Sequence, residues 1–300
     1  KYLLNCFALE GLWESTSGLG HEHCSLVGII HLKLVSMGIG TDHRCLSNHL
    51  EKDAPREVQR VIAPNTLSSD VNADPIKNNK FLGYSRGAHV PSKALALRAE
   101  RVAPRSSWVL YHPIWTVLRS AGPIHKHAMT WVRQLDHEIQ GIVLGPYSTI
   151  VGGASRHTLG ALERRASLDS LAALTLLARL HHEAGEHEWV WLYICSIFRV
   201  LLLLGTHFDQ YGVAERMFQL YVQRVFSLAE FEGRRVDLSN YDYVFASYHL
   251  VGIAERVRNK HGSQRDRRMP TFYALQALTG LYEQRFKKHF QIPLVSLAES

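Results

Sequence analysis

Cysteine is scarce in this sequence, and the few cysteines are spread too widely to build a cysteine-based site. The chain of 300 residues has four, at Cys6, Cys24, Cys45 and Cys195, and no two of them form a Cys-x-x-Cys pair. Small disulfide-stapled folds need dense, regularly spaced cysteines. The sequence therefore excludes a disulfide framework and is typical of a protein in a reducing compartment.

The sequence also lacks an uninterrupted apolar run long enough to span a membrane. The most apolar segment, Trp189–Leu204, has about 16 residues where a span needs about 20. It carries Arg199 near its middle, where a charge costs roughly 2.5–3.5 kcal/mol on insertion scales. A helix buried on all sides in a helical domain explains this segment, so we predict no membrane contact.

Acidic residues are outnumbered by basic ones, but the surplus is modest. The chain has 34 Lys and Arg against 27 Asp and Glu, and a formal net charge of +7. Such a balance suits acidic partners without identifying one. We interpret the densest basic stretch, Arg256–Arg268, as a solvated connector between helices. Nucleic-acid contact or an import signal is the alternative interpretation.

Two parts of the chain differ in their local patterning. Residues 1–105 mix short apolar runs with polar tracts, and the composition of residues 63–80 predicts a loop-rich linker. Over residues 106–300 apolar residues recur with the helical period, and no alternating strand pattern competes. We predict a mainly α, multi-helix domain over 106–300, preceded by an N-terminal segment whose fold the sequence leaves open.

The strongest helical signal lies over residues 167–209. Asp169 is a suitable N-cap, leucines follow it at helical spacing, and Gly185 marks a stop. A second helix is expected over residues 186–204, ended by Gly205 at a position that needs a positive φ. Further helices are expected at 128–144, 214–231, 243–260 and 271–290.

One short motif has the form of a serine nucleophile site. Residues Gly83–Gly87 fit Gly-x-Ser-x-Gly, in which a strained strand-to-helix turn exposes the serine, here Ser85. Polar residues precede it, Pro91 follows soon after, and no histidine base is identified for it; without a base, serine is a weak nucleophile. We favour a surface turn, and the alternative function is an α/β-hydrolase-like serine hydrolase, active or inactive.

Metal-ligating residues gather once in the N-terminal segment, without the spacing of a zinc motif. The weak candidates are His21, His23, Cys24, His43, Cys45 and His49. The pattern His182-Glu183 with His187 misses the zincin motif by one residue, because residues five apart do not share a helix face. We predict neither a bound metal nor another cofactor.

Arg199 needs an explanation because it lies in a segment that is otherwise apolar. An unpaired charge in a core costs several kcal/mol, so a buried guanidinium requires a partner. Asp209, or a carboxylate from a later helix such as Asp242, is the expected partner. We interpret the pair as structural rather than as a ligand contact.

The same segment resembles a known family. Residues 167–178, SLDSLAALTLLA, are similar to the SLxxLQALLLLA helix of the fungal-specific transcription factor domain, the middle homology region of zinc-binuclear-cluster regulators. That family continues with WxxxGxAxRxAxxLGLHxD, and a later Gly-Arg-Pro element precedes an acidic loop. The matching residues here are Trp191, Arg199, Gly205, His207 and Asp209 in the first pattern, and Gly233, Arg234 and Asp242 in the second.

The resemblance, which covers about residues 110–260, implies a non-enzymatic regulatory domain of a nuclear transcription factor. Such a domain works by intramolecular control, by contacts with a second copy or with coactivator proteins, and by binding a small-molecule effector. DNA is reached only through a zinc cluster of six close cysteines, which this chain lacks. Cys195, Ile197, Leu201 and Arg235 replace the family's small residues and proline, so the helix packing is expected to be looser or rearranged. The chain is then either the regulatory part without its DNA-binding domain or a divergent relative.

Overall fold

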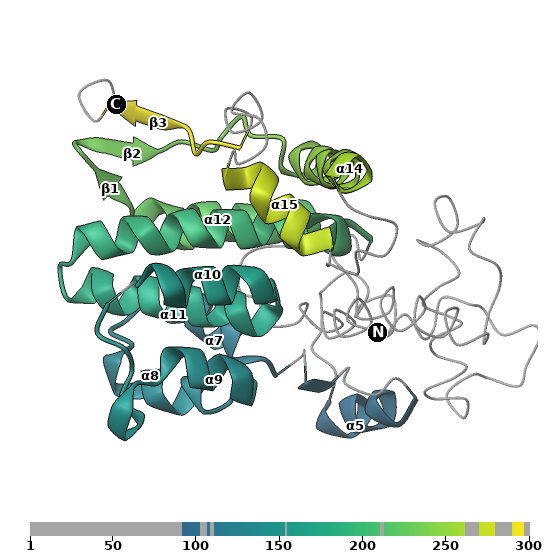
Figure 1. The fold of residues 1–300 in the computed structure, drawn as a ribbon. Helices are drawn as coiled ribbons and strands as arrows, with labels where there is room; N and C mark the ends of the chain where they lie inside the picture. The colour runs from purple at the N-terminus through teal and green to yellow at the C-terminus, as the bar shows by residue number, and fades with distance from the viewer. Residues whose placement is uncertain are drawn as a thin grey trace, which may run out of the picture. The chain divides into compact units, whose positions relative to one another are not determined.

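A computed structural model describes residues 92–102, 107–108, 111–153, 155–210, 213–261, 270–279 and 290–296 (Figure 1). Two compact units are present, one formed by residues 1–115 with 211–213 and the other by residues 116–210 with 214–300. Helix α5 (Lys93–Val102) lies in the first unit, and α7 (Pro113–Arg119) links the two in sequence. Most described residues are helical, which confirms the predicted mainly α class.

The helix expected over residues 128–144 is two shorter helices, α8 (His125–Val132) and α9 (His137–Val143). The break comes at Asp136, whose side chain accepts a hydrogen bond from the Glu138 amide at 2.8 Å and caps α9. A 3₁₀ turn, η6 (Pro146–Ser148), then leads to α10 (Arg156–Arg165), which Ser155 caps in the same way. Asp136 thus divides the expected helix, because an aspartate side chain that accepts from a nearby backbone amide favours a helix start over a helix interior.

Helix α11 (Leu168–Glu183) is the first of the central pair. Its N-cap is Ser167, whose hydroxyl accepts from the Ser170 amide at 3.1 Å, so the predicted cap at Asp169 is two residues too late. At the other end Gly185 has a φ of +74°, and the Glu186 amide donates to the His181 carbonyl at 2.9 Å. This Schellman arrangement confirms the predicted stop at Gly185.

Helix α12 (His187–Gln210) is longer than predicted. It continues through Gly205, which has no positive φ and does not end the helix. The expectation of a C-terminal stop at Gly205 is therefore wrong. The glycine serves a close contact between helices instead, as described below.

The remaining elements of the second unit surround α12. They are α13 (Ala214–Arg224), η7 (Phe226–Leu228), β1 (Glu230–Phe231), β2 (Arg234–Val236), α14 (Tyr243–His261), α15 (Pro270–Thr279) and β3 (Leu294–Ser296). The three strands form an antiparallel sheet in the order β1-β2-β3. The helix expected over 243–260 is confirmed, and the one expected over 214–231 ends early, at Arg224.

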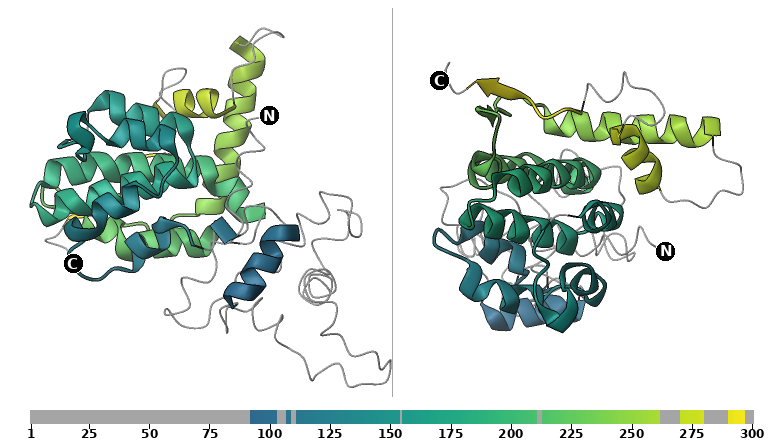
Figure 2. Two further views of the ribbon diagram at one scale, coloured as in Figure 1. Left: turned by 90° about the horizontal axis from the view of Figure 1, so that it is seen from below. Right: turned by 60° about the vertical axis from the view of Figure 1, so that its left-hand side comes forward.

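The second unit is built in layers, with α12 between α11 on one side and α14 on the other, while α10 and α15 contact α12 and each other (Figures 1 and 2). Most side chains of α11 and α12 are buried, including Leu174, Ile197 and Leu201 with no exposed surface. Among the described helices, α12 alone has the length and hydropathy to cross a membrane, and 61% of its most apolar window is buried in the protein. Packing within this layered core accounts for the apolar composition of α12.

Candidate functional site

The residues singled out from the sequence fall into two groups. Ser85 and the metal-site candidates lie outside the described residues; the latter are His21, His23, Cys24, His43, Cys45 and His49. The residues named by the family resemblance lie in the second unit, on α12 and in the segments between α13 and α14. In the described part of the chain no three His, Cys, Asp or Glu side chains come together as a metal site.

Arg199 is paired with Glu163 of α10. The guanidinium donates to Glu163 Oε1 at 2.8 Å, and the Ser196 hydroxyl donates to the same oxygen at 2.6 Å. The Glu163 side chain is 9% exposed and the Arg199 side chain 36%. A buried carboxylate thus has a charged partner and a neutral one, as a charge in a core requires.

The predicted partners of Arg199 are wrong, although the predicted ion pair is present. Asp209 lies on the same helix ten residues further on, and a rise of 1.5 Å per residue places it about 15 Å along the axis. Asp242 instead caps α14, where it accepts from the Phe245 amide at 2.9 Å. The sequence does hold a signal for Glu163, because it follows the buried Leu159 and Leu162 on the apolar face of α10.

Cys195 lies beside this pair and is not a reactive thiol. Burial raises the pKa of Cys195 to about 11, an effect that Arg199 opposes and Glu163 reinforces. The thiolate is the nucleophilic form, so at neutral pH this side chain is protonated and inert. Cys195 acts here as a small packing residue.

Gly205 is the point of closest approach between α12 and α14. A Cβ atom added there would lie 1.9 Å from Ser247 Oγ, 2.5 Å from Ser247 Cβ and 3.1 Å from Tyr243 Cζ. Beside it, the Tyr243 hydroxyl donates to the Leu201 carbonyl at 2.6 Å in a fully buried setting. Only a residue without a side chain permits this contact.

The end of α12 is tied to α14 by a second contact. Asp209 Oδ2 accepts a hydrogen bond from the Tyr248 hydroxyl at 2.9 Å. Burial lowers the pKa of His207, an effect that its hydrogen bond with Gln210 opposes, so His207 is neutral at pH 7. Both residues therefore have roles that are accounted for by packing and hydrogen bonding.

The first turns of α12 contact the small sheet. The Trp191 ring stacks on Phe231 of β1, with centroids 4.9 Å apart and an interplanar angle of 18°. Glu232 and Gly233, with φ of 52° and 70°, join β1 to β2 before Arg234. Two successive positive φ values are typical of a type I′ hairpin turn, which favours glycine. Trp191 thus lies against the β1–β2 hairpin whose turn contains Gly233, more than 40 positions later in the chain.

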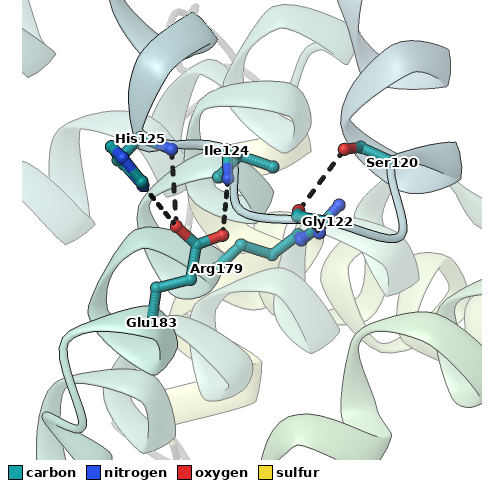
Figure 3. A network of polar contacts seen from close by, with 6 residues as sticks. All are labelled: Ser120, Gly122, Ile124, His125, Arg179 and Glu183. Carbon is teal, nitrogen blue, oxygen red and sulfur yellow. Dashed lines mark hydrogen bonds and ion pairs between the residues drawn. The ribbon is translucent and has the colours of Figure 1, made fainter.

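A further polar network, which no sequence pattern predicted, joins α11 to the turn before α8 (Figure 3). Glu183 accepts from the Ile124 amide at 2.7 Å and from the His125 amide at 3.4 Å, and its carboxylate lies 3.6 Å from the His125 ring. Arg179, one turn earlier on α11, donates to the carbonyls of Val117 and Gly122. Because residue 124 has no side-chain cap, Glu183 supplies the cap of α8 from another helix.

We expect the variant Glu183→Ala to destabilise the protein by about 1–2 kcal/mol, the usual cost of losing a helix cap. Two amides at the start of α8 would lose their acceptor, while the side chain itself has little buried surface to lose. The matched control is Glu188→Ala, which removes an exposed glutamate of α12. Urea unfolding of both variants checks this, and equal midpoints would contradict the capping role.

Several other buried polar groups of this region are also paired internally, although His182 Nδ1 on α11 is buried without a hydrogen-bond partner. His181 pairs with Glu186 through Nδ1, and its Nε2 lies 3.5 Å from the Tyr193 hydroxyl. The Tyr221 hydroxyl shares a hydrogen bond of 2.9 Å with Thr175. Burial raises the pKa of Tyr193 and of Tyr221, so both phenols stay protonated. These contacts hold helices together, and they present no activated nucleophile.

Comparisons with protein-family models, with curated proteins and with solved structures found no match. The interpretation of this region therefore depends on its own geometry. That geometry places Arg199, Gly205 and Asp209 at contacts between α12 and its neighbours.

Proposed function

We propose that this chain is the regulatory domain of a fungal-type nuclear transcription factor, and that it acts through protein contacts rather than through catalysis. Its partners would be coactivator proteins, a second copy of the chain or other segments of its own protein, and a small-molecule effector would bias those contacts. DNA would be reached only through a zinc-cluster domain.

One observation carries this proposal. Four of the five residues that match the family pattern on α12 are points where this helix meets another element. Trp191 contacts β1, Arg199 pairs with α10, and both Gly205 and Asp209 contact α14. A pattern spread along one helix in this way is what a scaffold needs, because each position fixes the place of a neighbour. An active site would instead bring such residues together around one reacting atom.

A tethering experiment tests the proposal. The whole chain is fused to a heterologous DNA-binding domain that has no transcriptional activity of its own, and reporter expression is measured in a fungal cell. We expect reporter expression to differ from that of the DNA-binding domain alone, in either direction. Equal reporter expression at equal protein levels would contradict a regulatory role.

The alternative serine hydrolase has its own test. The purified chain is treated with a fluorophosphonate, which labels serines that are activated as nucleophiles. Under our proposal neither the wild-type chain nor Ser85→Ala is labelled. Labelling that disappears in Ser85→Ala would favour the hydrolase.

A further inference from the structure

Helix α14 has two faces of different kinds. One face is buried in the second unit and includes Tyr243, Ser247 and Leu250. The opposite face is exposed although it carries large apolar side chains: Phe245 is 65% exposed, Tyr248 49% and Val251 38%. These residues, with Gly252, follow one another at helical spacing and form a single stripe. We call it the α14 face.

Gly252 lies at the C-terminal end of this face, and nothing inside the unit requires a glycine at this position. A Cβ atom added there would meet nothing within 4 Å. Glycine in a helix interior is destabilising relative to alanine, so an isolated chain gains nothing from it. Glycine on an exposed helix face does allow the backbone of another helix to approach closely. The notch at Gly252, flanked by Tyr248 and Val251, is suited to such an approach.

The charges along α14 are divided between its two ends. At the N-terminal end lie Asp242, which caps the helix, and Asp209, which holds the Tyr248 hydroxyl. At the C-terminal end the basic residues Arg256, Arg258 and Lys260 outnumber one acidic residue, Glu255. A helix that is acidic at one end and basic at the other is complementary to a copy of itself laid antiparallel.

We propose that a second copy of this chain binds the α14 face, with the two α14 helices antiparallel and crossing at Gly252. This inference assigns to α14 the contact with a second copy that the proposed function names, but it does not depend on the transcriptional role. The interface is isologous, so each contact occurs twice about a two-fold axis.

The antiparallel arrangement has a definite register. With the two Gly252 residues facing each other, the residue four positions after Gly252 faces the one four positions before it. Arg256 of one copy therefore lies opposite Tyr248 of the other, where the guanidinium and the ring form a favourable cation–π pair. Arg256 also comes close to Asp209 of the other copy, which accepts the hydrogen bond from Tyr248. Arg256 is positioned for this, since its Nε donates to the Gly252 carbonyl at 3.3 Å. Three positions out, Glu255 lies opposite His249, and seven positions out Asn259 lies opposite Phe245.

The mass of the purified full chain in sedimentation equilibrium tests this interface. We expect the wild-type chain, of 34.0 kDa, to approach twice that mass as its concentration rises. In Gly252→Leu the new side chain has open space in the single copy but separates the paired helices. That variant should therefore remain at 34.0 kDa with an unchanged or higher Tm, because leucine favours a helix more than glycine does.

Gly141 provides the matched control. It too lies at an exposed position of a helix, α9, and a Cβ atom there meets nothing within 4 Å, but its neighbours Glu138 and His137 are polar. Gly141→Leu should associate as the wild type does. A cysteine placed at the two-fold axis, Gly252→Cys, should form a covalent dimer on oxidation, while Gly141→Cys should not.

A wild-type chain that stays at 34.0 kDa at every concentration overturns the proposal. So does a dimer that is equally strong in Gly252→Leu, because its interface then lies elsewhere. If Gly252→Leu lowers the Tm, loss of the dimer could reflect unfolding, and the oxidation of the cysteine variants then tests the interface. Equal amounts of covalent dimer from Gly252→Cys and Gly141→Cys would contradict the antiparallel register. Neither result bears on reporter expression by the tethered chain, so this proposal and the regulatory role can fail separately.

Discussion

Gly205→Ala is expected to destabilise the protein by about 3 kcal/mol, near the upper end for overpacking a tightly packed contact. The added methyl group would overlap Ser247, whose Oγ lies 1.9 Å and whose Cβ lies 2.5 Å from its position. Both helices are long and buried, so α12 and α14 must move apart and disturb the hydrogen bond from Tyr243 to the Leu201 carbonyl. In a unit of this size the thermal midpoint should fall by roughly 6–12 °C.

A second substitution should relieve the overlap. In Gly205→Ala with Ser247→Gly, the methyl group takes the space of the removed side chain, and its nearest neighbour is Tyr243 Cζ at 3.1 Å. We therefore expect the double variant to be more stable than Gly205→Ala alone. The control Gly141→Ala, where nothing lies within 4 Å, should be neutral or slightly stabilising. If Gly205→Ala unfolds at the wild-type temperature, the close contact between α12 and α14 is wrong.

The second large effect is expected at the ion pair between α10 and α12. Arg199→Ala should cost about 2–3 kcal/mol, because it leaves the buried carboxylate of Glu163 with Ser196 as its remaining partner. Breaking a fully buried pair costs about 3–5 kcal/mol. The smaller figure is appropriate here because the Arg199 side chain is 36% exposed and solvent screens part of the interaction.

Replacing both members of the pair distinguishes a structural role from a chemical one. Arg199→Met with Glu163→Met removes both charges and keeps most of the packing volume. Buried ion pairs exchanged for apolar residues of similar volume are often neutral or stabilising. The double variant should thus unfold close to the wild type and well above Arg199→Ala. A double variant no more stable than Arg199→Ala would contradict this account of the pair.

The sequence predicted local features better than contacts between distant segments. Periodicity and the glycine at 185 correctly placed α11 and its stop, since both signals act within a few residues. Gly205 looked like another stop because a glycine after an apolar run has that meaning locally. Its actual role depends on Ser247, 42 residues later, and nothing near Gly205 indicates that helix.

The partner of Arg199 was missed for a related reason. Charge in an apolar helix predicts that a counter-charge exists, but the helix packing decides which one it is. The role of Glu183 was missed in the same way. This carboxylate on α11 accepts hydrogen bonds from the first amides of α8, a helix that has no capping side chain of its own. The family resemblance selected the residues on α12 that make contacts, while the contacts themselves appear only in the folded chain.

We propose that the motif residues of α12 hold the second unit together and take no direct part in its proposed regulatory activity. Reporter expression by the tethered Arg199→Met, Glu163→Met chain tests it most directly, with protein level and thermal midpoint measured alongside. We expect a folded chain whose effect on the reporter equals that of the wild type. A chain that folds like the wild type but has lost that effect would contradict it, because the charges themselves would then carry the function.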